Sequence, residues 1–312
     1  MMADHLVFGL DGGATRSRIA LSTLAGRIVC RLEGPSTNPY ASTYKDIASI
    51  ISSLIDEACK VSGYANRDII GGCIGNAGLS RPSEKEMFKH YFTEMLGPDI
   101  PVLLCNDAEI LMAGGLGEVQ GLCLIAGTGS IALGRLADGR TMRSGGLGWR
   151  LGDEGSAWWI AQQAINRLLQ SEEQRDLPTT MGQPLMEYFK VTDSTQLVPL
   201  FNGPELSKGT IAAAAPIVTS AAMAGDALAT DILNKAAAEL VDLVVSVVKR
   251  LPELGSSDLV CAGGVLEHDT VVLDEFHRNM SIQLPAVTIQ KGKGSALDGA
   301  LLLARDFVLQ RE

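Results

Sequence analysis

Near its N-terminus the chain reads LVFGLDGGATRSRIALS over residues 6–22, an apolar run that ends in a glycine-rich turn and then resumes. The first run spans Leu6 to Leu10, the second Ile19 to Leu21, and a third follows from Ile28 to Leu32. Short apolar runs separated by turn residues are typical of β-strands. The pattern predicts a three-stranded meander whose first turn is Asp11-Gly12-Gly13-Ala14-Thr15.

The same pattern returns once, roughly 115 residues later, a spacing that suits a duplicated domain rather than a solenoid. Leu122 to Ile125 leads into Ala126-Gly127-Thr128-Gly129-Ser130, and Ile131 to Leu136 follows. Both units place a turn that contains Gly and Thr after an apolar strand, and each continues to a second turn that ends in Gly-Arg. The repeat predicts two related halves, each with a twisted sheet that presents a glycine-rich hairpin.

Strands and helices alternate after each hairpin unit, which favours an α/β fold. Amphipathic spacing predicts a long helix over 226–251, with a stripe from Leu228 through Leu240 to Leu251. The segment 171–207 is richer in Pro, Gln and Thr and is expected to be irregular with short helices. The remaining predicted elements are helices over 42–61, 83–95, 154–169 and 295–309, and strands over 69–74, 102–105 and 259–262.

Charge and composition exclude several function classes. The 312 residues carry a formal net charge of −10, and 46% of them are hydrophobic. Nucleic acids and anionic membranes require basic surfaces, so neither is an expected partner. No uncharged apolar run reaches the ~18 residues of a membrane span, and no secretory leader is visible. The six scattered cysteines form no CxxC pair and indicate buried, reduced thiols in a cytoplasmic protein.

Four glycine-rich junctions follow predicted strands: Asp11-Gly12-Gly13, Gly127-Thr128-Gly129, Gly145-Gly146 and Gly263-Gly264. Glycine lets backbone N–H groups approach a phosphate closely, and Thr hydroxyls add donors. One such turn would suit an ordinary hairpin, but two matched turns in duplicated positions predict a polyphosphate site. The chain contains neither a P-loop motif nor a Rossmann fingerprint, so those nucleotide folds are disfavoured.

Three acidic residues and one amide stand at positions where chemistry competes with local structure. Asp11 suits a Mg²⁺ ion held through water, or a turn cap. Asp107 suits a general base in phosphoryl transfer, or the N-cap of the next helix. Asp153 suits a pair of sugar hydroxyls, or a helix start, where acidic residues are favoured. Asn38 lies in a loop by composition and suits an ordinary Asx or Pro turn.

In combination these sequence motifs resemble those of the N-acetylglucosamine kinase group of the BadF/BadG-type ATPases, within the superfamily of sugar kinases, actin and heat-shock ATPases. The resemblance covers nearly the whole chain, and its most specific motif is Gly152-Asp153-Glu154-Gly155-Ser156-Ala157-Trp158-Trp159. It implies two actin-like (ribonuclease H-like) domains with a ligand cleft between them. The expected division is 1–119 and 120–312, with the last helix packing back on the first domain.

The resemblance also implies a set of ligands and roles. ATP and Mg²⁺ are the expected cofactors, with Asp11 toward Mg²⁺ and Asp107 as the base on the sugar's 6-hydroxyl. A homodimer is implied by the family alone. The ATP-binding residues would be Asp11, Gly12, Gly13, Thr15, Gly127, Thr128, Gly129, Ala222, Gly263 and Gly264, and the sugar-binding residues Asn38, Asp107, Gly145, Gly146 and Asp153.

Two departures from the family pattern stand out. Ala14 replaces the usual third glycine of the first turn, and Leu147 stands where a Trp often follows the Gly-Gly pair, with Trp149 two places on. The second change leaves the preference for N-acetylated over free amino sugar open. The sequence therefore predicts an ATP-dependent amino-sugar 6-kinase. The alternatives are an ATPase coupled to a partner protein and a sugar sensor without catalysis.

Overall fold

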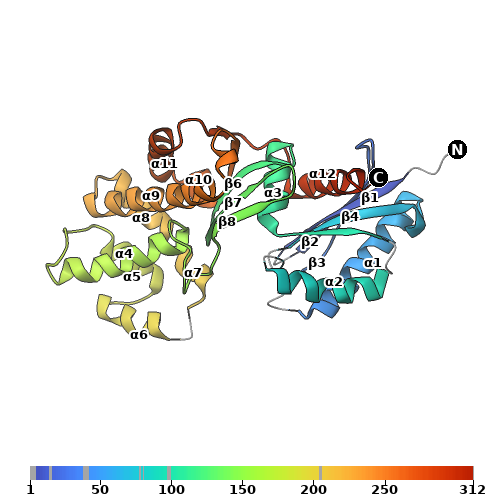
Figure 1. Cartoon of the computed structure of the whole chain (residues 1–312). Helices are drawn as coiled ribbons and strands as arrows, with labels where there is room; N and C mark the ends of the chain where they lie inside the picture. The colour runs from blue at the N-terminus through green and yellow to red at the C-terminus, as the bar shows by residue number, and fades with distance from the viewer. Residues whose placement is uncertain are drawn as a thin grey trace. The chain divides into compact units, whose positions relative to one another are not determined.

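The computed structural model describes residues 5–13, 16–37, 42–76, 79, 81–96, 100–203 and 206–311. It divides into two compact units, one of Met1–Gly121, Arg135–Arg140 and Gln290–Glu312 and the other of Leu122–Gly134 and Thr141–Ile289. The first unit thus includes the chain's last residues and the short segment 135–140. Each of the two sheets has five strands, and helices accompany both, which confirms the α/β class (Figure 1).

The first sheet has the order β3-β2-β1-β4-β5. The predicted meander is confirmed, because β1 pairs antiparallel with β2 and β2 antiparallel with β3. On its other side β1 pairs parallel with β4, and β4 parallel with β5, so these three strands end at the same edge. The strands are β1 (Leu6–Gly12), β2 (Arg16–Thr23), β3 (Ile28–Pro35), β4 (Ile69–Asn76) and β5 (Val102–Cys105).

Helices cover both faces of this sheet. In β2, Ile19 and Leu21 pack in the same core cluster as Ile47 of α1, whereas Ala20 between them packs against Leu297 of α12. This alternation follows from the two-residue period of a strand. Figure 1 shows α12 on one side of the sheet and α1 and α2 on the other. The helices are α1 (Tyr44–Ser62), the 3₁₀ turn η1 (Asn66–Asp68), α2 (Pro82–Leu96), α3 (Asp107–Leu116) and α12 (Ala296–Leu309).

The helices α3 and α12 cross at unusually short range through two glycines. An added Cβ on Gly114 would lie 1.9 Å from the carbonyl oxygen of Ser295, and one on Gly299 would lie 1.9 Å from that of Ile110. Only backbone without side chains can approach this closely. Because α12 also packs on β1, this crossing fixes α3 beside the sheet.

The second sheet has the order β10-β9-β6-β7-β8, with β6 and β9 parallel. Its central strands match the predicted repeat, and β8 is the strand expected before Gly145-Gly146, although no bounds were predicted for it. β10 had no predicted counterpart. The β8 sequence TMRSG lacks an apolar run and is half-exposed, and β10 has only three residues. The strands are β6 (Gly121–Ala126), β7 (Ser130–Arg135), β8 (Thr141–Gly145), β9 (Asp258–Ala262) and β10 (Thr288–Gln290).

The second unit is rich in helices, as predicted, and α9 is its long core helix. Asp226 caps α9, and the predicted stripe from Leu228 to Leu251 is buried. α9 packs against α4, α8 and α11. The helices are α4 (Ala157–Glu172), α5 (Gly182–Phe189), η2 (Ser194–Gln196), α6 (Leu197–Asn202), α7 (Lys208–Ala212), α8 (Ala215–Met223), α9 (Ala227–Arg250), η3 (Pro252–Leu254), α10 (Gly264–His268) and α11 (Thr270–Gln283).

The six cysteines are all unpaired thiols, five of them buried and Cys261 partly so. Burial raises the pKa of Cys59 to about 11, helped by the nearby charge of Asp56. Burial alone raises the pKa of Cys261 to about 12. Because the thiolate is the reactive form, these shifts make both residues poor nucleophiles, in agreement with the prediction of buried, reduced thiols.

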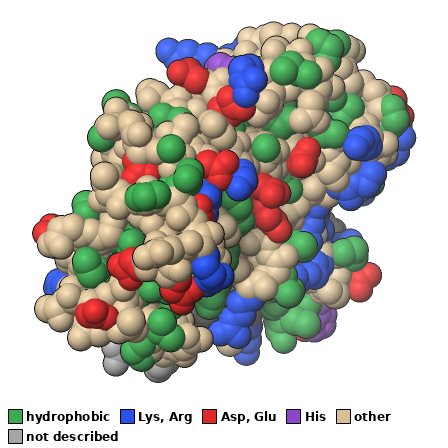
Figure 2. Space-filling view, turned by 90° about the vertical axis from the view of Figure 1, so that its left-hand side faces the viewer, with side chains coloured by type: hydrophobic (Ala, Val, Ile, Leu, Met, Phe, Trp, Pro, Cys, Tyr) green, Lys and Arg blue, Asp and Glu red, His purple; other side chains and the backbone are tan. Residues whose placement is uncertain are grey.

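The surface carries charges of both signs. On the face in Figure 2, Lys and Arg side chains are interspersed with Asp and Glu and with hydrophobic side chains. Within the part of the chain that the structure describes, no helix is long and apolar enough to cross a bilayer.

Candidate active site

In the first unit, Asp11 stands at the end of β1, where the glycine-rich turn begins. Its Oδ2 lies 3.4 Å from Nη1 of Arg18 on the neighbouring strand. Burial raises the pKa of Asp11, although the Arg18 charge acts in the opposite direction. Gly13 closes the turn, since its N–H donates to the carbonyl of Arg16 at 3.1 Å. The predicted site residue Thr15 and its neighbour Ala14 lie outside the described residues.

A buried polar cluster of Ser17, Thr37 and Asn76 packs against the first glycine-rich turn. Ser17 and Thr37 share a hydroxyl–hydroxyl hydrogen bond of 2.9 Å, and Asn76 Nδ2 donates to the carbonyl of Thr37 at 2.8 Å. A Cβ on Gly12 would lie only 2.5 Å from Asn76 Nδ2, so the glycine lets the turn rest directly on the cluster. The cluster fixes the residue that precedes Asn38, which itself lies outside the described residues. Sequence reasoning missed Asn76, whose signal is an amide at the end of an apolar strand.

Asp107 is the first residue of α3 and is not its N-cap. Asn106 takes that role, because its Oδ1 accepts from the Glu109 N–H at 2.8 Å and its own N–H donates to Glu109 Oε1 at 3.1 Å. The capping alternative for Asp107 is therefore wrong. Burial raises the pKa of Asp107, and the charge of Asp11 raises it further, against hydrogen bonds from the backbone. A carboxylate that is free of capping and has a raised pKa suits proton transfer.

Glu109 anchors the same helix turn with buried charges. Its Oε2 lies 3.5 Å from Nη1 of Arg135, and both side chains are less than a tenth exposed. Lys85 of α2 lies 3.6 Å from Oε1. Removing one partner of a buried ion pair leaves an uncompensated charge, which is strongly destabilising. This network therefore holds the start of α3, and with it Asp107, in place.

In the second unit, the matching turn lies between β6 and β7. The Gly127 N–H donates to the carbonyl of Gly129 at 2.9 Å, and the Gly127 carbonyl accepts from the N–H of Ala157 at the start of α4. Ser130 ties the turn to its surroundings, since its Oγ donates to the Glu154 carbonyl at 2.6 Å. Its own carbonyl accepts from the Gly146 N–H at 2.8 Å. The turn is thus held by its neighbours while Thr128 stands at its tip.

Gly145 and Gly146 end β8 in the left-handed region, with φ of 72° and 66°. A Cβ on Gly146 would lie 2.7 Å from Ile131, so glycine permits the close return of this chain onto β7. Leu147 and Trp149 follow and remain exposed, and Trp149 makes an edge contact with Trp158. The structure therefore brings the predicted Gly145-Gly146 pair to the same Ser130 that borders the second turn.

Asp153 is buried next to the Gly127–Gly129 turn. Its side chain is 4% exposed, and it adopts a left-handed φ of 66°, rare for a residue other than glycine. Oδ1 accepts from the Ser130 N–H at 3.2 Å, and Oδ2 lies 2.6 Å from Nζ of Lys208. Ser156 caps α4, so the predicted helix start at Glu154 is three residues early and Asp153 is not a cap. Its contact with a sugar stays a prediction.

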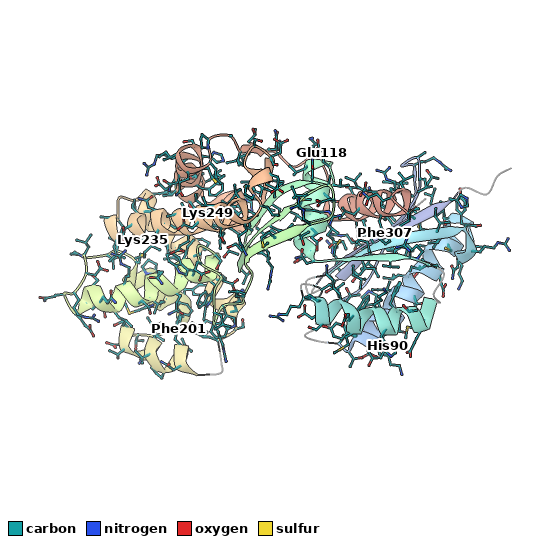
Figure 3. All side chains as sticks on the ribbon, viewed as in Figure 1. His90, Glu118, Phe201, Lys235, Lys249 and Phe307 are labelled. Carbon is teal, nitrogen blue, oxygen red and sulfur yellow. The ribbon has the colours of Figure 1, made fainter. Side chains whose placement is uncertain are left out.

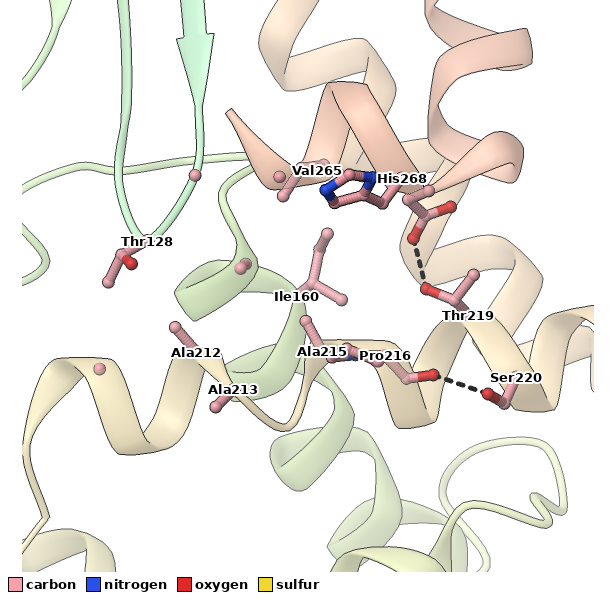
Figure 4. Close-up of a pocket in the computed structure, with 15 residues that line it drawn as sticks. Thr128, Ile160, Ala212, Ala213, Ala215, Pro216, Thr219, Ser220, Val265 and His268 are labelled. Atoms are coloured by element: carbon pink, nitrogen blue, oxygen red, sulfur yellow. Dashed lines mark hydrogen bonds between the residues drawn. The ribbon is translucent and has the colours of Figure 1, made fainter. Parts of the chain in front are cut away.

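A cavity of about 530 Å³ in the second unit extends from the Gly127–Gly129 turn (Figure 4). Thr128 stands at one end, Ala212, Ala213 and Ala215 form an apolar wall, and Val265 and His268 lie at the other end. There the Thr219 hydroxyl donates to Asp269, which also caps α11. Gly264 lines the cavity, whereas Ala222 lies one turn of α8 beyond the lining residue Thr219 and is not among the lining residues. The alanine run 212–215 is the signal that could have located this wall.

Gly263 precedes the lining residue Gly264 and has a backbone conformation that residues with a side chain rarely adopt. It has φ 98° and ψ 150°, and an added Cβ would lie 2.5 Å from the Ala126 carbonyl oxygen and 2.9 Å from the Gly127 nitrogen. The backbone strain costs about 1–3 kcal/mol, and the contact pushes directly on the turn. We expect Gly263→Ala to lower the melting temperature and to weaken nucleotide binding.

A matched control separates the two causes for Gly263. Gly225 has a similar φ of 93° but nothing within 4 Å of its added Cβ. Gly225→Ala should therefore show the strain alone, with nucleotide affinity preserved, when both variants are compared by thermal unfolding and titration calorimetry. Equal losses in the two variants would contradict a role for the contact between Gly263 and the turn.

Known proteins resemble this chain along almost its whole length. The N-acetylmuramic acid/N-acetylglucosamine kinase of Clostridium acetobutylicum is 33% identical, with 96% of this chain and 98% of that protein covered. The N-acetyl-D-glucosamine kinase of Dictyostelium discoideum is 30% identical, with 97% and 98% covered. The fold matches a Chromobacterium violaceum structure assigned as an N-acetylglucosamine kinase, with TM-score 0.70, 21% identity and coverage of 96% and 99%. The model of the BadF/BadG/BcrA/BcrD ATPase family matches residues 8–304, and the chain belongs to this family.

Proposed function

We propose that this protein is an ATP-dependent amino-sugar kinase that phosphorylates the 6-hydroxyl of N-acetylglucosamine or glucosamine. Support for the substrate class comes from the two relatives above, which are named as amino-sugar kinases, and from a third, a Vibrio cholerae glucosamine kinase, 26% identical over 95% of this chain. The homodimer and the division of the chain near residue 119 stay predictions.

The observation that carries the proposal is the state of Asp107. Its neighbour Asn106 caps α3, and the buried Glu109 network anchors that turn, while Asp107 Oδ1 accepts only a local hydrogen bond from the Ala108 N–H at 3.1 Å. Its raised pKa strengthens it as a base relative to an ordinary, fully solvated carboxylate. In the proposed reaction Asp107 orients the sugar hydroxyl and accepts its proton as the oxygen attacks the terminal phosphorus of ATP.

The remaining roles follow the glycine turns. Thr128 and the backbone of Gly127 and Gly129 would bind phosphate oxygens. Gly264 lines the cavity proposed for adenosine, with Gly263 next to it in the chain and Ala222 beyond the lining residues. In the first unit, Gly12, Gly13 and Thr15 would also face phosphate. Asn38, Gly145, Gly146 and Asp153 are the proposed sugar-binding residues.

Asp11 is the residue proposed to hold Mg²⁺. Within the described ranges, no three His, Cys, Asp or Glu side chains gather into a metal-binding group. Mg²⁺ commonly binds through one or two carboxylates together with waters and phosphates, so a single half-buried Asp11 fits such an ion. When bound, the ion would neutralise phosphate charge. Arg18, which lies beside Asp11, partly offsets the burial that raises the pKa of this carboxyl.

The test is ADP release with Mg-ATP, measured alone and with N-acetylglucosamine, glucosamine, N-acetylmannosamine, muramic acid or glucose. Release that depends on an amino sugar, with the phosphate located on its 6-oxygen by NMR, is the expected result. It would also answer the question that Leu147 leaves open, the preference for acetylated or free amine. Release that ignores every sugar would replace the proposal with a partner-coupled ATPase, and no release with any sugar would favour a sensor.

A further inference from the structure

Lys208, the first residue of α7, reaches the glycine turn of the second unit from a distant part of the sequence. Its Nζ lies 2.6 Å from Oδ2 of Asp153 and only 2.7 Å from where a Cβ of Gly129 would stand. The absence of a side chain at Gly129 therefore leaves room for the ammonium group beside the turn. No motif marks this lysine in the sequence, since it lies 55 residues from Asp153.

The ion pair is asymmetric in its exposure. The Asp153 side chain is 4% exposed, whereas the Lys208 side chain is 26% exposed. Both Asp153 oxygens have a partner, one the Ser130 N–H and the other Lys208. An ammonium group has three N–H donors, and within the described residues Asp153 is the one acceptor found for them. Asp153 thus fixes the position of Lys208 and leaves it donors to spare.

Lys208 lies next to residues that line the turn's end of the cavity, although it is not itself a lining residue. The next residue, Gly209, and Ala212 on the same helix line the cavity together with Gly127 and Thr128 (Figure 4). Across the described chain, the backbone N–H groups of Thr128 and Gly129 donate to no acceptor. Three kinds of donor therefore gather near the turn's end of the cavity: two backbone N–H groups, the Thr128 hydroxyl and the Lys208 ammonium with its spare N–H bonds.

Such a set is suited to an anion rather than to a sugar. A lysine binds phosphate as a point charge, and successive backbone N–H groups form an anion-binding concavity. Beyond this end, the alanine wall of the cavity, Ala212, Ala213 and Ala215, suits an apolar, planar group. A nucleotide carries both chemistries in one molecule, with its phosphates at one end and its base at the other.

We propose that Lys208 binds the phosphoryl groups of the nucleotide at the Gly127–Gly129 turn. Asp153 holds the lysine in place for this role. The proposal rests on the ATP-binding part of the proposed function and not on the identity of the sugar. It gives Asp153 a positioning role toward Lys208 in addition to its proposed contact with the sugar. During transfer the ammonium would stabilise negative charge on the phosphate oxygens, which is the main contribution that a protein makes to this reaction.

The test is titration calorimetry of the full chain with three probes: adenosine, ADP and the non-hydrolysable analogue AMPPNP. Lys208→Gln should weaken AMPPNP and ADP about 10- to 100-fold while the affinity for adenosine stays within twofold, because only the phosphates meet the lysine. Lys208→Arg, which keeps the charge, should recover much of the loss. Asp153→Asn, which tolerates the left-handed backbone, should weaken the same two probes less than Lys208→Gln does.

The matched control is Lys249→Gln, an exposed lysine in the last turn of α9 (Figure 3). It removes the same charge and should change none of the three affinities by more than twofold. If Lys208→Gln behaves like this control, or weakens adenosine as much as ADP, the lysine is a structural partner of Asp153 and the proposal is overturned. Thermal unfolding of each variant shows whether it is folded when it is titrated.

These binding measurements remain informative if the sugar kinase assignment fails. If the wild type shows no sugar-dependent ADP release but Lys208→Gln weakens AMPPNP binding, the role of the lysine is supported and the sugar kinase proposal is contradicted. If the wild type phosphorylates an amino sugar but Lys208→Gln leaves the affinity for AMPPNP unchanged, the kinase proposal is supported and the role of the lysine is contradicted.

Discussion

Asp107→Asn is expected to lower kcat for sugar phosphorylation by about 10²- to 10⁴-fold while the protein stays fully folded. The substitution keeps the size and hydrogen-bonding shape of the side chain but removes its ability to accept the proton of the attacking hydroxyl. Because the amide can still contact the hydroxyl, KM for the sugar should change far less than kcat. Steady-state kinetics with the preferred sugar and Mg-ATP measure both quantities.

The pH dependence of the wild type should report the same group. Burial raises the pKa of Asp107 above its ordinary value of 3.8, and the charge of Asp11 adds to this. The base acts when it is ionised, so kcat/KM should fall as the pH drops through this raised pKa. The acid limb should therefore lie at higher pH than for a solvated aspartate, and it should vanish from the residual activity of Asp107→Asn.

Stability separates this catalytic role from a structural one. A carboxyl whose pKa is raised by folding binds its proton more tightly in the folded state, so it costs stability once the pH exceeds its unfolded pKa. At neutral pH, Asp107→Asn should leave the melting temperature unchanged or raise it. The benefit of an acidic residue at a helix start works against this, but the net upward pKa shift shows that burial dominates.

The neighbouring residue provides the matched control. Asn106→Ala removes the N-cap of α3 and should cost about 0.5–2 kcal/mol, with a lower melting temperature. If Asp107→Asn destabilises the protein as much as Asn106→Ala, its effect on kcat would come from a disturbed helix start. That outcome would contradict the assignment of Asp107 as the base.

The sequence predicted what is local and periodic. The apolar run Leu6 to Leu10 and its repeat at residue 122 became β1 and β6, because a buried strand needs little beyond its own apolar residues. The apolar stripe from Leu228 to Leu251 predicted α9 in the same way, because a long helix buries one apolar face against the core. The elements missed were those without such a pattern, such as α8, whose residues APIVTSAAM are mostly apolar and form no amphipathic stripe.

The candidate site was less predictable, because its geometry depends on contacts between distant residues. Asp153 was found from its motif, but no motif showed its left-handed backbone. Its pairing with Lys208 depends on α7, which has no pattern of its own. Likewise, Asn76 acquires its role only where β4 passes beside Thr37. A motif can indicate which residues gather at a glycine turn, but the partners that orient them become visible only in three dimensions.

The second large effect is expected at the crossing of α3 and α12. In Gly299→Ala the added Cβ would lie 1.9 Å from the Ile110 carbonyl oxygen and 2.4 Å from the Gly114 nitrogen. These are backbone atoms of a capped helix, so they cannot rotate away as a flexible side chain would. The helices must separate, and we expect a loss of about 3 kcal/mol or more, at the upper end for overpacking.

The damage should be local to the first unit, which distinguishes it from a general loss of stability. Because the chain has two units, unfolding need not be two-state, and hydrogen exchange is the better probe. Exchange should accelerate in α3 and α12, while the amides of α9 in the second unit remain protected. Sugar phosphorylation should fall as well, because α3 begins with Asp107.

The control for this crossing is Gly209→Ala, also within a helix, where the nearest atom to the added Cβ is 3.8 Å away. With no contact to relieve, alanine should leave stability unchanged or raise it by up to about 1 kcal/mol through its higher helix propensity. If Gly299→Ala were equally harmless and α3 stayed protected, the two helices would have to tolerate a wider crossing. The position of Asp107 would then depend on the Asn106 cap and the buried pair of Glu109 and Arg135 rather than on α12.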